Sequence, residues 1–194
     1  RVKETGAKVA LREKDFGYWN NYTWNDFYDY VRKIALGLEK VGVKRGDKLA
    51  LIGDNIPEML FMAIGAQSIG AVSAGIYQTT LPDEIAELIN YMDVTAVFCD
   101  DQEQVDKLVE IRDRIPQVRK VIYEDPRGMR SYRSDDWYLL IEDLYEIGAA
   151  SNAENPEKYD VLIDRGSPDD VCHFCLTSGT TGLSKASIDR KSVV

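Results

Sequence analysis

The hydrophobic positions of this chain change their spacing at intervals, from strand-like to helical and back. Two short stretches, 8–12 and 18–23, flank a Gly/Asn-rich turn region and predict a hairpin. Apolar residues then recur on one helical face over 24–41, with Thr23 as the expected N-cap. Gly42 is the expected stop of this first long helix.

Strand-like and helical segments continue to alternate downstream. The unbroken apolar run at 49–52 lies between two Gly-Asp pairs, which predicts a central strand covered on both faces. Helices are expected at 57–70, 82–92 and 101–114, and strands at 71–77, 94–98 and 119–123. This order predicts an α/β fold, a three-layer α/β/α arrangement around a mostly parallel sheet.

The remaining third of the chain is more polar. Residues 124–136 are expected to form a loop, 137–147 an amphipathic stretch and 149–157 a polar linker. A short helix at 157–163 and one more strand at 170–176 complete the expected elements.

Residues 59–82 carry no charge, so a membrane-spanning helix has to be weighed there. Such a helix needs about 18 or more apolar residues in succession. The mean hydropathy of 59–77 is only roughly 1.5, because Gln67, Ser68, Ser73 and several glycines interrupt the segment. We favour a buried helix that runs into a buried strand, and a membrane-anchored interaction protein is the alternative.

The net charge and the cysteine content indicate which partners and which cellular location to expect. The 194 residues include 24 basic and 33 acidic side chains, so the net charge is −9. This charge repels a phosphate backbone, and nucleic acid is therefore not an expected partner. Three cysteines without a signal-peptide pattern fit a reducing, cytoplasmic location rather than a disulfide framework.

The segment that follows the last expected strand carries the clearest chemistry. It combines hydroxyl side chains, two glycines and one lysine in nine consecutive positions: Thr177, Ser178, Gly179, Thr180, Thr181, Gly182, Leu183, Ser184 and Lys185. Glycines allow close backbone approach, backbone N–H groups and hydroxyls donate to phosphate oxygens, and an ammonium offsets phosphate charge. The segment predicts a polyphosphate-binding loop, with a flexible Ser/Thr/Gly surface loop as the alternative. The common nucleoside-triphosphatase loop requires Gly-Lys in succession and does not fit.

These nine residues resemble the signature loop of adenylate-forming enzymes, the superfamily of acyl-CoA synthetases, luciferases and non-ribosomal peptide adenylation domains. That pattern runs Thr-Ser-Gly-Thr-Thr-Gly-x-Pro-Lys, and Ser184 stands where proline is usual, which removes rigidity but keeps the lysine in register. Upstream, residues 36–47 resemble the helix-turn-strand entry of these enzymes. Residues 76–82 and 126–130 resemble fatty acyl-CoA synthetases, the latter favouring the long-chain branch.

The resemblance implies a two-step reaction. A carboxylate attacks the α-phosphate of ATP to give acyl-adenylate and pyrophosphate, and the thiol of coenzyme A then displaces AMP. Implied cofactors and partners are ATP, Mg²⁺, coenzyme A and a fatty acid, with peripheral association at the inner face of a membrane as a further candidate. The residues implied to bind the β- and γ-phosphates are Thr177, Ser178, Gly179, Thr180, Thr181 and Gly182, with Lys185 as their counter-charge. No nucleophile from the protein is implied.

Other candidate residues receive structural interpretations. Cys172 and Cys175 have the spacing of a metal pair, but residues three apart on a strand face opposite sides of the sheet. His173, the single histidine, fits a hydrogen-bonded core residue better than a catalyst. Three acidic pairs are expected to start helices or to be solvated at element edges: Asp100-Asp101, Asp135-Asp136 and Asp169-Asp170.

The resemblance also predicts how the chain is divided. We expect residues 1–188 to be an incomplete, N-terminal part of the large domain of an adenylate-forming enzyme, with a truncated start because residue 1 is not methionine. Residues 189–194 are expected to be a non-native tail, because they match the translation of a common sequencing-adapter string. The alternatives are a non-catalytic nucleotide- or phosphate-binding module and another adenylate-forming ligase.

Overall fold

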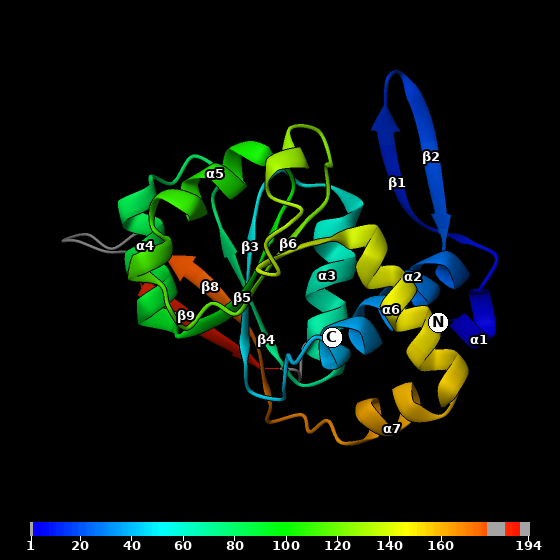
Figure 1. Cartoon of the computed structure of the whole chain (residues 1–194). Helices are drawn as coiled ribbons and strands as arrows, with labels where there is room; N and C mark the ends of the chain where they lie inside the picture. The colour runs from blue at the N-terminus through cyan, green and yellow to red at the C-terminus, as the bar shows by residue number, and fades with distance from the viewer. Residues whose placement is uncertain (1, 178–184, 191–194) are drawn as a thin grey trace.

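A seven-stranded sheet separates two layers of helices in the computed structural model, which describes residues 2–177 and 185–190 (Figure 1). The strand order is β7-β6-β5-β3-β4-β8-β9. Every neighbouring pair is parallel except β8 and β9, which are antiparallel. The strands are β3 (Lys48–Ile52), β4 (Val72–Ile76), β5 (Val94–Cys99), β6 (Lys120–Tyr123), β7 (Tyr138–Leu140), β8 (Val171–Thr177) and β9 (Lys185–Arg190). The predicted three-layer α/β/α fold is confirmed.

Each face of the sheet has its own helices and its own apolar core. One face carries α2 (Trp24–Lys40), α3 (Pro57–Ser68), α6 (Ile141–Glu154) and α7 (Lys158–Asp164), and the other carries α4 (Pro82–Met92) and α5 (Gln102–Glu110). Along β3, Leu49 and Leu51 join the first core, whereas Ala50 and Ile52 join the second. The handedness of the connections explains why helices lie on both faces. The connection from β3 to β4 and the connection from β4 to β5 run in opposite directions along the sheet. Because such connections are right-handed, their helices α3 and α4 lie on opposite faces.

The long helix α2 begins where the sequence predicts. The Thr23 hydroxyl accepts a hydrogen bond from the Asp26 N–H at 3.2 Å, and the Asp26 carboxylate accepts one from the Thr23 N–H at 2.8 Å. This reciprocal capping box satisfies two backbone donors that the helix itself leaves unpaired. At the other end, Gly42 adopts a φ of 95°, the left-handed conformation that ends many helices.

Thr23→Ala is expected to lower the free energy of unfolding by about 1 kcal/mol, since it removes the N-cap acceptor. Urea unfolding followed by circular dichroism measures the change. Thr79→Ala is the matched control, because Thr79 is exposed in the loop after β4. The control should change stability by less than about 0.5 kcal/mol. Equal losses in the two variants would contradict the capping role.

The predicted N-terminal hairpin is present and projects from the rest of the molecule (Figure 1). It consists of β1 (Val9–Asp15) and β2 (Tyr18–Thr23), and a four-residue helix, α1 (Val2–Thr5), precedes it. The turn is tight because Phe16 and Gly17 both adopt positive φ angles, 44° and 88°. Leu11 and Tyr22 at the base of the hairpin pack against the core that α2 and α3 share.

The structure adds detail to one expectation for the polar third of the chain and contradicts another. The amphipathic stretch 137–147 is divided: Tyr138–Leu140 is strand β7, paired with β6, and α6 starts at Ile141. The expected linker at 149–157 is helical as far as Glu154. Tertiary packing overrides the local pattern in both places, since the Trp137 indole N–H donates to the Val118 carbonyl at 2.8 Å and the polar Ser151 is buried.

The uncharged segment 59–82 is divided between helix and strand, as favoured above. Phe61 and Met62 of α3 are fully buried, and Ala74 of β4 is fully buried as well. Within residues 2–177 and 185–190, the structure contains no helix with the length and apolar content needed to span a bilayer.

Candidate phosphate-loop site

The structure brings together the two ends of the nine-residue motif. Thr177 is the last residue of β8 and Lys185 the first of β9, and the two are paired across the antiparallel ladder. The Thr177 hydroxyl donates to the Lys185 carbonyl at 3.1 Å, and both side chains are exposed. The other predicted phosphate ligands, Ser178, Gly179, Thr180, Thr181 and Gly182, lie outside the described residues, as does Ser184.

The motif follows β8 at the carboxyl edge of the parallel strands. After β3 the chain passes to α3 on one face, and after the neighbouring β4 it passes to α4 on the other face. The chain therefore diverges between these two strand ends, which is where open α/β sheets form their binding crevices. β8 pairs with β4, so the motif begins at the same edge.

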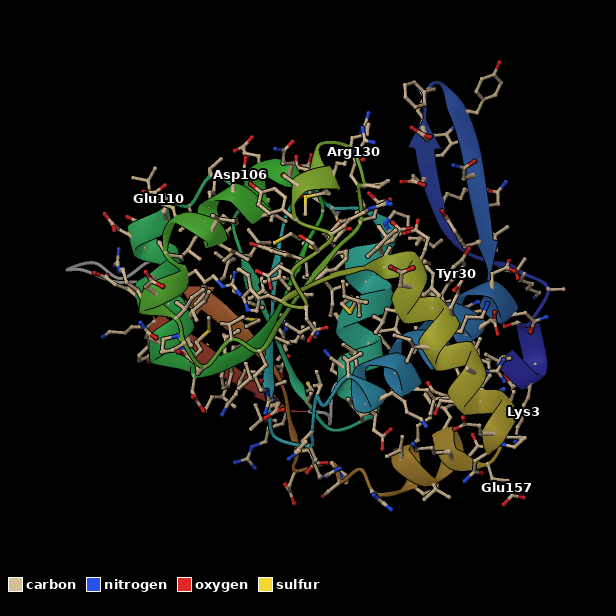
Figure 2. The ribbon with its side chains drawn as sticks, viewed as in Figure 1. Lys3, Tyr30, Asp106, Glu110, Arg130 and Glu157 are labelled. Atoms are coloured by element: carbon tan, nitrogen blue, oxygen red, sulfur yellow. The ribbon has the colours of Figure 1, made fainter. Side chains whose placement is uncertain are left out.

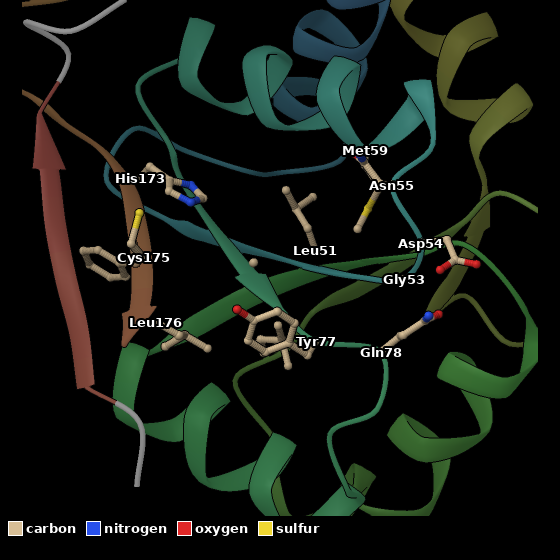
Figure 3. A pocket seen from close by; sticks show the side chains of 13 residues that line it. Leu51, Gly53, Asp54, Asn55, Met59, Tyr77, Gln78, His173, Cys175 and Leu176 are labelled. Atoms are coloured by element: carbon tan, nitrogen blue, oxygen red, sulfur yellow. The ribbon is translucent and has the colours of Figure 1, made fainter. Parts of the chain in front are cut away.

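A cavity of about 400 Å³ lies along these strand ends (Figure 3). Its lining combines apolar side chains of the strands with polar groups of the loops after β3 and β4. The lining residues are Leu51, Gly53, Asp54, Asn55, Met59, Gly75, Ile76, Tyr77, Gln78, His173, Phe174, Cys175 and Leu176. A methyl group at Gly75 would meet no atom within 4 Å, so the middle of this sheet face is open to the cavity.

His173 lines the cavity, and a hydrogen bond with Ser73 positions its imidazole ring. Its Nδ1 atom lies 2.8 Å from the hydroxyl of the fully buried Ser73, and the Gln67 amide donates to that hydroxyl at 2.9 Å. Burial lowers the pKa of His173 below its usual value, while the nearby Asp189 carboxylate acts in the opposite direction. The imidazole is therefore hydrogen-bonded, as expected, and its ring also lines the cavity (Figure 3).

This lowered pKa predicts how stability depends on pH. Below the ordinary histidine pKa of about 6.5, the unfolded chain takes up a proton that folded His173 resists. The free energy of unfolding is therefore highest above that pH, and it decreases as the pH falls because protonation of His173 favours the unfolded chain. His173→Gln is expected to lose less stability than wild type between pH 7.5 and pH 5 in urea unfolding. Identical losses would show that His173 titrates normally in the folded protein.

The two cysteines of β8 differ in exposure. Cys172 is buried, and Cys175 is exposed beside His173. In the part of the chain that the structure describes, no three His, Cys, Asp or Glu side chains are grouped so that they could hold a metal ion. That the two sulfurs face opposite sides of the sheet stays a prediction from strand geometry.

Comparison with known proteins shows the family to which this chain belongs. The family model described as AMP-binding enzyme matches residues 1–188. The chain belongs to the AMP-binding enzyme family. It is 31% identical over 182 residues, 93% of its length, to long-chain-fatty-acid–CoA ligase ACSBG1 of Rattus norvegicus. It is 25% identical over 186 residues to long-chain-fatty-acid–CoA ligase ACSBG2 of Xenopus laevis. The chain spans about a quarter, 24%, of the length of each of these relatives.

Solved structures of adenylate-forming ligases share the fold. The anthranilate CoA ligase AuaEII, in complex with anthranoyl-AMP, matches with a TM-score of 0.79 and 19% identity over 96% of this chain and 32% of that chain. The N-terminal domain of FACL13 from Mycobacterium tuberculosis matches with a TM-score of 0.67 and 20% identity over 88% of this chain and 38% of that chain.

In this AMP-binding family member, Asp100 departs from the expectation of a solvated edge charge. Only 8% of it is exposed, and its Oδ2 atom accepts a hydrogen bond from the Asp54 N–H at 2.6 Å. Burial raises the pKa of this carboxyl group. Gly53 is required beside it, because a Cβ atom there would lie 2.3 Å from Asp100 Cγ. Asp100 thus fixes the loop after β3 at the cavity, whereas Asp101 caps α5 as expected.

Sequence reasoning expected a hydrogen-bonded His173 but did not find its partners. Ser73, Gln67 and His173 come from three different elements, and no local pattern joins them. One signal was available: Ser73 is a polar residue inside an apolar run, and a buried polar group needs a partner. The partner's identity depends on the pairing of β4 with β8, which the sequence alone does not give.

Proposed function

We propose that this chain is the phosphate-loop part of an ATP-dependent long-chain fatty acyl-CoA ligase. In that reaction the carboxylate of a fatty acid attacks the α-phosphate of ATP, pyrophosphate leaves, and the coenzyme A thiol then displaces AMP from the acyl-adenylate. The observation that carries the proposal is the family match over 1–188 together with the opposed ends of the motif at the carboxyl edge. The curated relatives named as long-chain ligases supply the substrate class.

The contribution of this chain is positioning and charge compensation. Thr177 and Lys185 are ladder partners, so the two ends of the motif lie side by side. Backbone N–H groups and hydroxyls of such a Gly/Ser/Thr-rich motif can donate to phosphate oxygens. The Lys185 ammonium would then offset the charge that develops on departing pyrophosphate. The protein supplies no covalent nucleophile in this scheme.

Magnesium is also implied by the proposed reaction. The described residues offer no cluster of three carboxylate, imidazole or thiolate side chains. A magnesium ion bound with ATP often takes only one or two protein carboxylates, with the other ligands being phosphate and water.

Exchange of labelled pyrophosphate into ATP tests the proposal in the full-length protein that contains this sequence. Exchange should require a fatty acid, and adding coenzyme A should convert the same acid to its thioester. Exchange that requires an aryl carboxylate instead would indicate another adenylate-forming ligase. Nucleotide binding in calorimetry without exchange for any acid would indicate a non-catalytic phosphate-binding module.

A further inference from the structure

A second cavity lies at the amino edge of the parallel strands, and we refer to it as the amino-edge cleft. Its lining precedes three strands: residues 42–45 lead to β3, Ile69 to β4 and Arg165 to β8. The turn after α2 and the end of α7 form its walls, and its volume is about 270 Å³ (Figure 1). Among the described residues, this cleft shares no lining residue with the cavity at the carboxyl edge.

The floor of the amino-edge cleft is apolar. Val43 is 3% exposed and Ile69 is 4% exposed. Leu162 of α7 is partly buried and packs against the same core. A Cβ atom at Gly42, which also lines the cleft, would meet no atom within 4 Å, so the space beside this floor is unfilled. An alkyl chain that lies on these side chains leaves water, which is the usual source of apolar binding energy.

Two basic side chains, Lys44 and Arg165, add positive charge to the cleft. Both line it, and both are exposed. Within residues 2–177 and 185–190, no carboxylate forms an ion pair with either side chain; the nearby ion pairs join other residues. One ammonium and one guanidinium group are therefore available to donate to an anion, and hydrogen bonds of this charged type are the strong ones.

The other charged groups of the lining are already paired. The Lys158 ammonium donates to the Glu39 carboxylate at 2.6 Å, and Arg45 forms an ion pair with Asp170. Backbone carbonyls at the end of α2 are also occupied, because the N–H groups of residues 41–43 donate to them. The positive charge of the two remaining basic side chains is thus not cancelled by the lining.

The acidic residues of α7 lie on the face of the helix that is turned away from the cleft. Asp160 and Asp164 are four residues apart and share one helix face. Leu162 is two residues from each of them, so it lies on the opposite face, which lines the cleft. Asp47, in the turn before β3, forms an ion pair with Arg119. The carboxylates near the cleft in sequence are therefore outside its lining or already paired.

We propose that the amino-edge cleft binds a small amphiphilic anion, an alkyl carboxylate or an alkyl phosphate. The alkyl chain lies on the floor formed by Val43, Ile69 and Leu162, and the anionic head accepts hydrogen bonds from Lys44 and Arg165. A ligand of this class satisfies both halves of the lining, whereas a neutral alkane or a bare anion satisfies only one. Binding here does not depend on ligase activity, because the cleft opens at the edge of the sheet opposite the motif.

Isothermal titration calorimetry of the full-length protein, without ATP or coenzyme A, tests this binding. Hexanoate and hexyl phosphate are the probes, and the one that binds more tightly identifies the preferred head group. Affinity should rise about fourfold for each methylene from butanoate to hexanoate, as expected for burial of the chain. Hexylamine and inorganic phosphate should each bind at least tenfold more weakly than hexyl phosphate. Inorganic phosphate that binds as tightly as hexyl phosphate would overturn the proposal, because the apolar floor would then contribute nothing.

Charge-removing variants show whether the head group binds in this cleft. Lys44→Gln with Arg165→Gln should weaken binding of hexyl phosphate about tenfold, and the fold should persist because both side chains are exposed. Lys14→Gln with Arg130→Gln is the matched control, since it removes the same charge from two other exposed positions. Figure 2 shows Arg130 on the other side of the molecule from Glu157, the residue before α7. The control should bind within about twofold of wild type, and equal losses in the two double variants would contradict the proposal.

A photoreactive ligand locates the site directly and separates it from an acyl substrate site. Hexanoate that carries a diazirine on its chain should label residues 39–45 or 158–165, and hexyl phosphate should compete with this labelling. Leu162→Gln should reduce the labelling, because it replaces part of the apolar floor with an amide. Labelling confined to other segments, or no binding of either hexyl anion by the wild-type protein, would show that the proposal is wrong. Absence of pyrophosphate exchange would contradict only the proposed ligase function.

Discussion

Lys185→Ala is expected to slow acyl-adenylate formation by roughly 10- to 150-fold and to leave thioester formation from preformed acyl-adenylate near the wild-type rate. A charge-assisted contact to phosphate contributes about 1.5 to 3 kcal/mol, and this range sets the expected loss. Pyrophosphate takes part only in the first step. The effect should therefore be confined to adenylation if Lys185 compensates its charge.

The structure indicates that this variant keeps its fold. The Lys185 side chain is exposed, and the contact that joins the ends of the motif uses its backbone carbonyl, which alanine also provides. Lys185→Arg retains the charge and should recover part of the adenylation rate. Lys14→Ala, at an exposed position on β1 of the hairpin, is the matched control and should change neither step. Equal losses in both half-reactions would show that the loop does not bind pyrophosphate.

The parallel core was predictable because burial on both faces leaves a direct mark on the sequence. A strand such as β3, covered by helices on each side, has to be apolar at its buried positions, and Leu49 to Ile52 shows this pattern. β7 shows why the sequence pattern does not predict other strands. It has three residues, and its place beside β6 depends on a pairing that no local periodicity encodes.

The candidate site likewise has one part that the sequence predicts and one part that it does not. The motif ends, Thr177 and Lys185, were predictable because their chemistry is contiguous in sequence, and the structure places them opposite each other. The contact of His173 with Ser73 joins residues one hundred positions apart. Asp100 and Asp54 are likewise joined only by the order of β5 and β3 in the sheet. Such supports follow from topology, which a single sequence does not specify.

The α2–α6 contact yields the largest expected effect on stability. Two glycines allow these helices to approach closely: a Cβ atom at Gly37 of α2 would lie 2.6 Å from the Leu144 carbonyl oxygen. A Cβ atom at Gly148 of α6 would lie 1.8 Å from the Lys33 carbonyl oxygen. Both obstacles are backbone atoms of the opposite helix, so no side-chain rotation relieves them.

Gly148→Ala is therefore expected to lower the free energy of unfolding by roughly 3 kcal/mol, at the upper end for an overpacked core. The usual gain of about 1 kcal/mol from replacing a helical glycine by alanine opposes the loss but is smaller. Gly75→Ala is the matched control, because a Cβ atom there meets nothing within 4 Å and its φ is not positive. Urea unfolding of the full-length protein should show a large loss for Gly148→Ala and no loss for Gly75→Ala. A Gly148→Ala variant as stable as wild type would mean that α2 and α6 are farther apart than the structure shows.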